Sequence, residues 1–155
     1  MPSTPSLQEQ YAPQNICFGC GVANREGLQI CSRVEGDLLV AIFQPKPHHQ
    51  AYQGMLNGGI IGTLLDCNGA WTGAWHFMQK QGLEGPPCVV TAEYTIKMVL
   101  PTPATRPVRI EGWVVKSGNR SVTTAGRLIV DDQETATCEG VFVAVKEGHP
   151  AWHRW

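Results

Sequence analysis

The sequence predicts an α+β domain in which a six-stranded antiparallel sheet wraps around one long central helix. Two observations support this fold class. Only residues 58–79 show a long helical period of apolar residues, whereas two strand-like runs precede this segment and four follow it. Parallel strands need a crossover connection, usually a helix, and one helix is too few for six parallel strands. We therefore expect the strands to pair antiparallel.

The first two expected strands cover residues 27–34 and 38–43. Both are short apolar runs, and the residues between them, 35–37, have the composition of a hairpin turn. Residues 45–50 break the pattern with two prolines and are expected to form a loop. At the start of the chain, residues 1–14 hold three prolines among polar residues and are expected to form a flexible arm.

The expected helix carries two stripes of residues that differ in size. One stripe is large and apolar and is expected to pack in the core: Ile60, Leu64, Cys67, Trp71 and Trp75. The other stripe is small apart from one carboxylate: Gly59, Gly62, Asp66, Gly69, Ala70 and Gly73. Each glycine costs a helix roughly 1 kcal/mol relative to alanine. So many glycines indicate close approach by another backbone or by a ligand.

Four strands are expected after the helix, at residues 90–98, 108–116, 121–130 and 135–145. Turn-forming residues separate the last three of them. In the first, alternation predicts one face with Val90, Ala92, Tyr94, Ile96 and Met98, and the other face with Thr91, Glu93, Thr95 and Lys97. The expected organisation is the arm at residues 1–14, a single domain at residues 15–147 and a tail at residues 148–155.

The composition is that of a folded domain without a strong charge. Of the 155 residues, 43% are hydrophobic and 16% are charged, which argues against disorder. The formal net charge is −1, which favours neither nucleic acid nor an anionic membrane surface as a partner. The first residues lack the basic and apolar segments of a signal peptide, and no apolar run has membrane-spanning length. We expect a cytoplasmic protein.

Six cysteines occur at irregular spacing, at positions 17, 20, 31, 67, 88 and 138. Without an export signal, we interpret them as reduced thiols rather than as a disulfide framework. Cys17 and Cys20 have a spacing found in metal and redox sites, and Cys31 is the candidate for a third ligand. Zinc needs about four ligands, however, and no histidine pair with finger spacing follows. We interpret these cysteines as structural and predict neither a metal nor a cofactor.

The motif that points to chemistry is Asn57-Gly58-Gly59 at the start of the expected helix, followed by Asp66 two turns later. Glycines at a helix start let a substrate approach free backbone N–H groups, which carry the positive end of the helix dipole. Such donors stabilise an oxyanion, and an aspartate is able to act as a base or a nucleophile. The motif predicts acyl chemistry by a hydrolase. The alternative for Asp66 is an ordinary surface carboxylate.

Together with the expected strand order, these motifs resemble the hotdog-fold thioesterases, in particular the phenylacetate-pathway and acyl-CoA thioesterase branch. The resemblance covers residues 17–146. It implies a hotdog fold, hydrolysis of acyl-CoA or aryl-CoA thioesters, and a homodimer, or a dimer of dimers, with each site between two subunits. The sequences that carry it are Cys17-Phe18-Gly19-Cys20-Gly21, Asn24, Gly27-Leu28, His49-Gln50-Ala51-Tyr52-Gln53-Gly54, Gly58-Gly59, Thr63-Leu64-Leu65-Asp66 and Pro101.

The resemblance also implies roles for individual residues. Asp66 falls on the catalytic carboxylate, Gly58 on the oxyanion-binding N–H, and Thr91 on the residue that positions the attacking water. Gly59 or Asn57 is expected to assist Gly58. Asn57 stands where the family usually has histidine, and an amide donates a hydrogen bond but transfers no proton. Whether Asp66 acts as a general base or as a nucleophile stays open.

Five further residues are expected to bind the substrate, each with a plainer alternative. Lys116 and Arg120 flank a turn and are candidates for the CoA phosphates, or form a solvated hairpin. Trp71 is a candidate for an acyl or aryl pocket, or packs in the core. His49 and Gln50 are expected near the thioester, or are loop residues. Because Asn57 replaces histidine, a non-catalytic acyl-CoA-binding protein is one alternative function. A hotdog hydratase or dehydratase is a second alternative, against which Asn57 argues.

Overall fold

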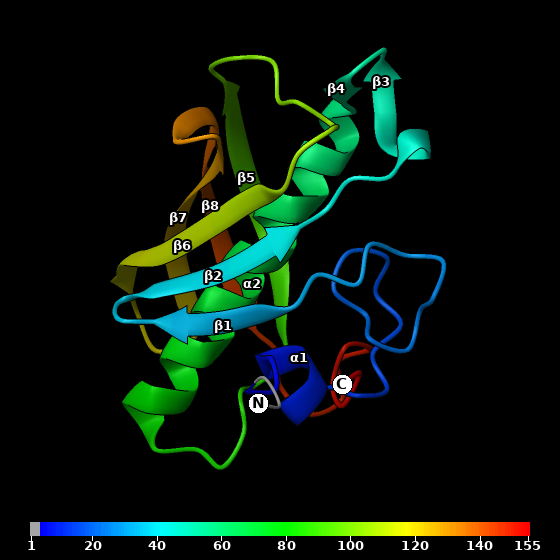
Figure 1. Cartoon of the computed structure of the whole chain (residues 1–155). Helices are drawn as coiled ribbons and strands as arrows, with labels where there is room; N and C mark the ends of the chain where they lie inside the picture. The colour runs from blue at the N-terminus through cyan, green and yellow to red at the C-terminus, as the bar shows by residue number, and fades with distance from the viewer. Residues whose placement is uncertain (1–3) are drawn as a thin grey trace.

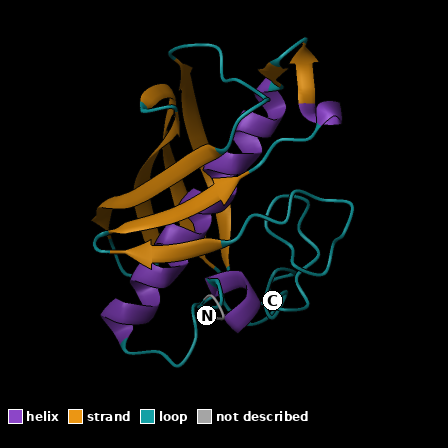
Figure 2. Ribbon diagram, viewed as in Figure 1, coloured by secondary structure: helices purple, strands orange, loops and turns teal. Residues whose placement is uncertain are grey.

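One long helix, α2 (Gly58–Gln81), lies in the curve of a six-stranded antiparallel sheet (Figure 1). The computed structural model describes residues 4–155. The strand order in the sheet is β1-β2-β6-β7-β8-β5, so β1 and β5 are its edge strands. The strands wrap around the helix, while the connections gather at the two ends of the sheet (Figure 2). This architecture confirms the predicted fold class.

The predicted strand boundaries agree with the structure to within two residues, with one exception. The prediction is wrong for residues 27–31, which precede the first strand. Here the backbone N–H groups of Leu28 and Ile30 donate to the carbonyl oxygens of Phe18 and Gly19, at 2.7 and 2.9 Å, so this segment pairs with a loop. The strands of the sheet are β1 (Ser32–Glu35), β2 (Leu38–Phe43), β5 (Val89–Met98), β6 (Val108–Ser117), β7 (Ser121–Val130) and β8 (Gln133–Ala144).

The segment before α2 contains structure where a plain loop was expected. A short 3₁₀ helix, η1 (Pro47–His49), leads into a two-stranded sheet of β3 (Gln50–Tyr52) and β4 (Met55–Leu56). The N–H of Asn57 donates to the carbonyl oxygen of His49 at 2.9 Å. This bond ties the segment to the residue that caps the helix.

The expected N-terminal arm contains a short helix, α1 (Leu7–Tyr11), which is capped by Ser6 and Glu9. Leu7 belongs to the core, and the buried amide of Gln8 donates to the Ser32 hydroxyl at 3.1 Å and accepts from the Ser32 N–H at 2.7 Å. Residues 6–12 are therefore held against β1, which differs from the expected flexible arm. Residues 1–3 of that arm lie outside the described residues, and the boundaries of the arm, domain and tail stay predictions.

The small stripe of α2 lets the helix lie close to β7 and β8. A Cβ atom placed on Gly73 would lie 2.6 Å from Cγ1 of Val122, and one placed on Gly69 would lie 2.9 Å from the ring of Phe142. At Gly69 and Gly73 the group that approaches the helix is therefore a side chain of the sheet. The sequence had led us to expect a backbone or a ligand there. None of the helices among residues 4–155 combines the length and apolar character needed to cross a membrane.

We predict that Gly69→Ala and Gly62→Ala change stability in opposite directions. A Cβ on Gly62 would meet Ile96 at an ordinary 3.5 Å, so this variant should gain up to about 1 kcal/mol of helix propensity. A Cβ on Gly69 would press on Phe142 and Thr124, and overpacking of about 1–3 kcal/mol should outweigh the same gain. Denaturant unfolding of both variants measures the signs. A stabilised Gly69→Ala would contradict tight packing at this crossing.

Candidate active site

The start of α2 is capped by Asn57. Its Oδ1 accepts from the N–H of Ile60 at 3.1 Å, and its carbonyl oxygen accepts from the N–H of Ile61 at 3.0 Å. Asparagine is among the best residues for this position because its side chain satisfies a backbone donor that has no partner within the helix. Asn57 therefore shapes the helix terminus.

Two backbone N–H groups remain available beyond this cap. Gly58 and Gly59 are exposed, and among residues 4–155 their N–H groups have no acceptor. They lie at the positive end of the helix dipole. Beside them is an apolar cavity of about 340 Å³, which Gly58 lines. Other residues that line it are Tyr52, Leu56, Ile61, Met98 and Leu100. The helix start thus offers hydrogen-bond donors next to an apolar surface.

Asp66 lies further along α2, half-buried against β5. The Thr91 hydroxyl donates to its Oδ1 at 2.7 Å. Burial raises the pKa of the Asp66 carboxyl, and the hydrogen bond from Thr91 opposes this by lowering it. The carboxylate is therefore held in place by one neighbour and partly shielded from water, as expected for a group with a chemical role.

A β-bulge in β5 brings Thr91 to Asp66. Strict alternation predicted that Thr91 and Tyr94 lie on opposite faces, and this is wrong. The register of β5 against β8 shifts between Thr91 and Glu93, so that Thr91 pairs with Phe142 and Tyr94 pairs with Gly140. Thr91 and Tyr94 consequently share the face that looks toward α2. Bulges redirect a side chain in this way and are common next to active sites.

The two parts of the candidate site are far apart within one chain. Asp66 follows Gly58 by eight residues, which corresponds to about 12 Å along the helix axis. Helix N–H groups point toward the N-terminus, so an acceptor bound to Gly58 lies beyond the start of the helix, away from Asp66. One protomer cannot bring both groups to the same carbonyl.

Comparison with known proteins identifies the family. A model of the Thioesterase superfamily matches residues 53–137, more than half of the chain, and this range includes Gly58, Asp66 and Thr91. The chain belongs to the thioesterase superfamily. A comparison with curated proteins finds no significant match.

Several solved structures share the fold, and one of them is a thioesterase-superfamily protein by name. This protein, from Shewanella loihica, is 28% identical with a TM-score of 0.65, and the match covers 81% of this chain and 98% of that one. The PaaI protein from the phenylacetic acid degradation operon of E. coli is 14% identical with a TM-score of 0.65, covering 77% and 81%. A Streptococcus mutans protein bound to acetyl-CoA is 16% identical with a TM-score of 0.62, covering 75% and 88%.

The other expected site residues of this thioesterase-superfamily chain are placed differently. The buried ring of His49 accepts at Nδ1 from the N–H of Lys46 at 3.0 Å, and burial lowers its pKa. The amide of Gln50 donates to the carbonyl oxygen of Pro47 at 2.7 Å and accepts from the N–H of Gly54. Both side chains hold the segment before α2 together, which makes them positioning residues for the helix start.

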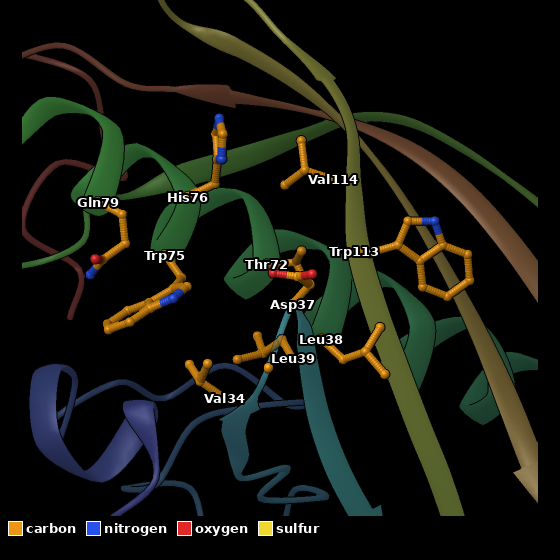
Figure 3. A pocket seen from close by; sticks show the side chains of 11 residues that line it. Val34, Asp37, Leu38, Leu39, Thr72, Trp75, His76, Gln79, Trp113 and Val114 are labelled. Carbon is orange, nitrogen blue, oxygen red and sulfur yellow. The ribbon is translucent and has the colours of Figure 1, made fainter.

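Trp71 lies in the core rather than on an open surface. Its side chain is 1% exposed and stacks on Trp155 with ring centroids 4.3 Å apart. Nearby, Trp75 lines a second cavity of about 460 Å³ between α2, the β1–β2 hairpin and β6, together with Trp113 and His76 (Figure 3). This cavity lies toward the C-terminal half of α2, away from the free N–H groups. Of these two cavities, the one at Gly58 adjoins the free N–H groups.

Lys116 and Arg120 lie near the opposite end of α2 from Gly58. The turn between them contacts the helix through Lys80, whose Nζ donates to the Ser117 hydroxyl at 3.3 Å. Lys80 follows Asp66 by fourteen residues, about 21 Å along the axis. The structure therefore separates the expected phosphate-binding residues from the expected site of hydrolysis within one protomer.

Proposed function

We propose that the protein hydrolyses acyl-CoA or aryl-CoA thioesters to the free acid and CoA. The observation that carries this proposal is that free N–H groups at the start of α2 open beside an apolar cavity. A thioester carbonyl needs such donors when it becomes an oxyanion, and its acyl group needs an apolar surface. The thioesterase superfamily supports the reaction class, and acetyl-CoA bound to the S. mutans protein supports CoA as the carrier.

In the proposed reaction, the N–H of Gly58 donates to the carbonyl oxygen of the thioester and the N–H of Gly59 assists. Loss of one such donor typically costs about 3 kcal/mol in the transition state. Asn57 contributes through its cap, because the bond from Ile60 to its Oδ1 keeps the first turn in place. The donors are thus oriented before the substrate arrives.

Asp66 is the proposed base or nucleophile. The Thr91 hydroxyl donates a hydrogen bond to Oδ1 of Asp66, so Oδ2 of Asp66 is the oxygen that takes part in the reaction. As a base, Asp66 removes a proton from a water molecule whose oxygen attacks the carbonyl carbon, and CoA leaves as the thiol. As a nucleophile, it forms a mixed anhydride with release of CoA, and water then hydrolyses the anhydride. In both routes a lone pair of the Thr91 hydroxyl is able to position the water.

The distance between Gly58 and Asp66 leads us to propose that two copies of the chain build each site. One copy supplies the free N–H groups and the other supplies Asp66 with Thr91. Edge strand β5 suits such a homodimer because its outer edge has backbone groups that no strand pairs among the described residues. Exposed apolar side chains on and just after β5 support the same surface: Tyr94, Met98, Val99 and Leu100.

Lys116 and Arg120 remain the candidates for the phosphates of CoA. We predict that Arg120→Glu raises the KM for an acyl-CoA about tenfold, equivalent to 1.4 kcal/mol, because it replaces attraction by repulsion. The KM for the same acyl group on N-acetylcysteamine, which lacks the phosphates, should not change. Arg25→Glu, at another exposed cation, is the matched control. An equal increase for both substrates would remove Arg120 from phosphate binding.

A panel of CoA thioesters tests the proposed function. Short, long and aromatic acyl-CoAs are incubated with the purified protein, and the loss of thioester absorbance is followed together with the acid product. We expect turnover of at least one thioester. Binding of acyl-CoA without turnover would favour the acyl-CoA-binding alternative. Addition of water to an enoyl-CoA without thioester cleavage would favour the hydratase alternative.

A further inference from the structure

Three cysteines from two distant segments meet beside the candidate site. Cys17 and Cys20 come from the loop after α1, and Cys67 comes from α2, directly after Asp66. Their sulfur atoms all lie within 4.8 Å of one another, and those of Cys17 and Cys67 are 3.8 Å apart. Cys31, the third ligand considered from the sequence, is not in this group. We call Cys17, Cys20 and Cys67 the cysteine cluster.

The distance between the sulfur atoms of Cys17 and Cys67 matches that of a thiolate metal site. A tetrahedral zinc ion with bonds of about 2.3 Å to sulfur places its ligand atoms about 3.8 Å apart. Cys20 and Cys67 are buried, whereas Cys17 is half-buried, so the cluster has one side near solvent. A cation bound by all three sulfurs would therefore keep one position for a water molecule.

The loop is shaped to bring the sulfur atoms together. A Cβ on Gly19 would lie 2.3 Å from the sulfur of Cys67, so only glycine permits this approach. Gly21 is equally confined, because its Cβ would lie 2.5 Å from backbone atoms of Cys17. The N–H of Gly21 donates to the carbonyl oxygen of Cys17 at 2.8 Å and closes the turn.

Two side chains donate hydrogen bonds to the cysteine cluster. The indole N–H of Trp71 donates to the sulfur of Cys20 at 3.3 Å, and the amide of Asn15 donates to the same sulfur at 3.6 Å. Donors of this kind orient the ligands of thiolate metal sites.

We propose that Cys17, Cys20 and Cys67 bind one thiophilic divalent cation of the zinc class, with water as the fourth ligand. Binding releases the remaining thiol protons and forms three metal–sulfur bonds without any change of oxidation state. The ion joins the loop after α1 to the third turn of α2, next to Asp66. Its role is therefore to hold this part of the candidate site together. The proposal is independent of whether the protein hydrolyses thioesters.

Cobalt and zinc binding test the cysteine cluster directly. The full-length protein is stripped of metal with a chelator under reducing conditions and then titrated with Co²⁺. We expect one Co²⁺ per chain, a thiolate-to-cobalt charge-transfer band, and loss of that band when Zn²⁺ is added. Zinc should also raise the midpoint of thermal unfolding. Absence of the band with excess Co²⁺, or a Cys17–Cys67 disulfide under the same reducing conditions, would overturn the proposal.

Variants assign the ligands. Loss of a residue that only hydrogen-bonds to a metal ligand typically weakens metal binding about 10–100-fold. Cys17→Ser and Cys67→Ser each remove a ligand itself, so each should weaken zinc binding by at least this much. Gly19→Ala retains every thiol but should weaken binding because it separates them. Cys31→Ser is the matched control and should bind normally. If Cys67→Ser fails to fold, Cys17→Ser on the half-buried loop decides. Equal affinity in Cys17→Ser and the unaltered protein would show that the cluster is not the site.

Discussion

Replacing Asp66 with asparagine is expected to lower kcat for acyl-CoA hydrolysis by about 10²–10⁴-fold, the usual contribution of a positioned base. Asparagine has the same shape, and its side-chain oxygen still accepts from the Thr91 hydroxyl. It lacks only the negative charge that removes a proton or attacks a carbonyl. Steady-state hydrolysis of the best thioester from the panel, with calorimetric binding of the same thioester, measures the effect.

Binding should distinguish a catalytic from a structural role of Asp66. We expect Asp66→Asn to bind the acyl-CoA with a Kd close to that of the unaltered protein and to unfold at a similar temperature. Glu84→Gln provides the matched control, because Glu84 is an exposed carboxylate in the loop after α2, outside the candidate site. Unchanged kcat in Asp66→Asn would remove Asp66 from the mechanism.

The largest expected effect on stability comes from Phe142→Ala. Phe142 is 1% exposed, and its ring lies against Gly69 of α2 and Gly140 of its own strand. Removing a buried aromatic ring typically costs 3–5 kcal/mol, roughly 6–20 °C in the midpoint of thermal unfolding. Val141→Ala, at a half-buried position on the other side of β8, should cost about 1 kcal/mol or less. Chemical and thermal unfolding measure both values.

Combining Phe142→Ala with Gly69→Ala tests whether the lost stability comes from the contact between α2 and the sheet. In the Phe142→Ala background the ring no longer meets a Cβ at position 69, whereas Thr124 stays 3.0 Å from it, so Gly69→Ala should be less destabilising there. Additive effects of the two substitutions would show that Phe142 does not enforce glycine at position 69. In that case the glycines of α2 need another explanation.

Features that depend on local sequence were largely predictable. The predicted limits of β7 match those in the structure, because turn-forming residues flank a clear apolar run at both ends. The helix start was predicted from its glycines, and Asn57 also carries the ordinary signal of an N-cap. Ser6 and Glu9 have the spacing of a capping box, a signal that would have predicted α1 within the expected arm.

Features that depend on tertiary contact were not predictable in this way. The bulge that turns Thr91 toward Asp66 adds one residue to an alternating pattern and leaves no local signal. The meeting of Cys67 with Cys17 and Cys20 arises because a loop folds back on a helix some fifty residues away. The axial distance between Gly58 and Asp66, by contrast, follows from the predicted helix itself.

The central claim is that the helix start of one copy and Asp66 of a second copy act on the same thioester. Gly58→Pro removes the N–H donor and suits the first helical position, and Asn57 already has the extended backbone that precedes proline. Gly58→Pro and Asp66→Asn, each of which is expected to lose most of the activity alone, are coexpressed with two different affinity tags, and dimers that carry both tags are isolated. One site of such a dimer has both an intact Gly58 and an intact Asp66, so about half of the wild-type activity should return. Failure to obtain mixed dimers, or mixed dimers without activity, would contradict a site shared between two copies.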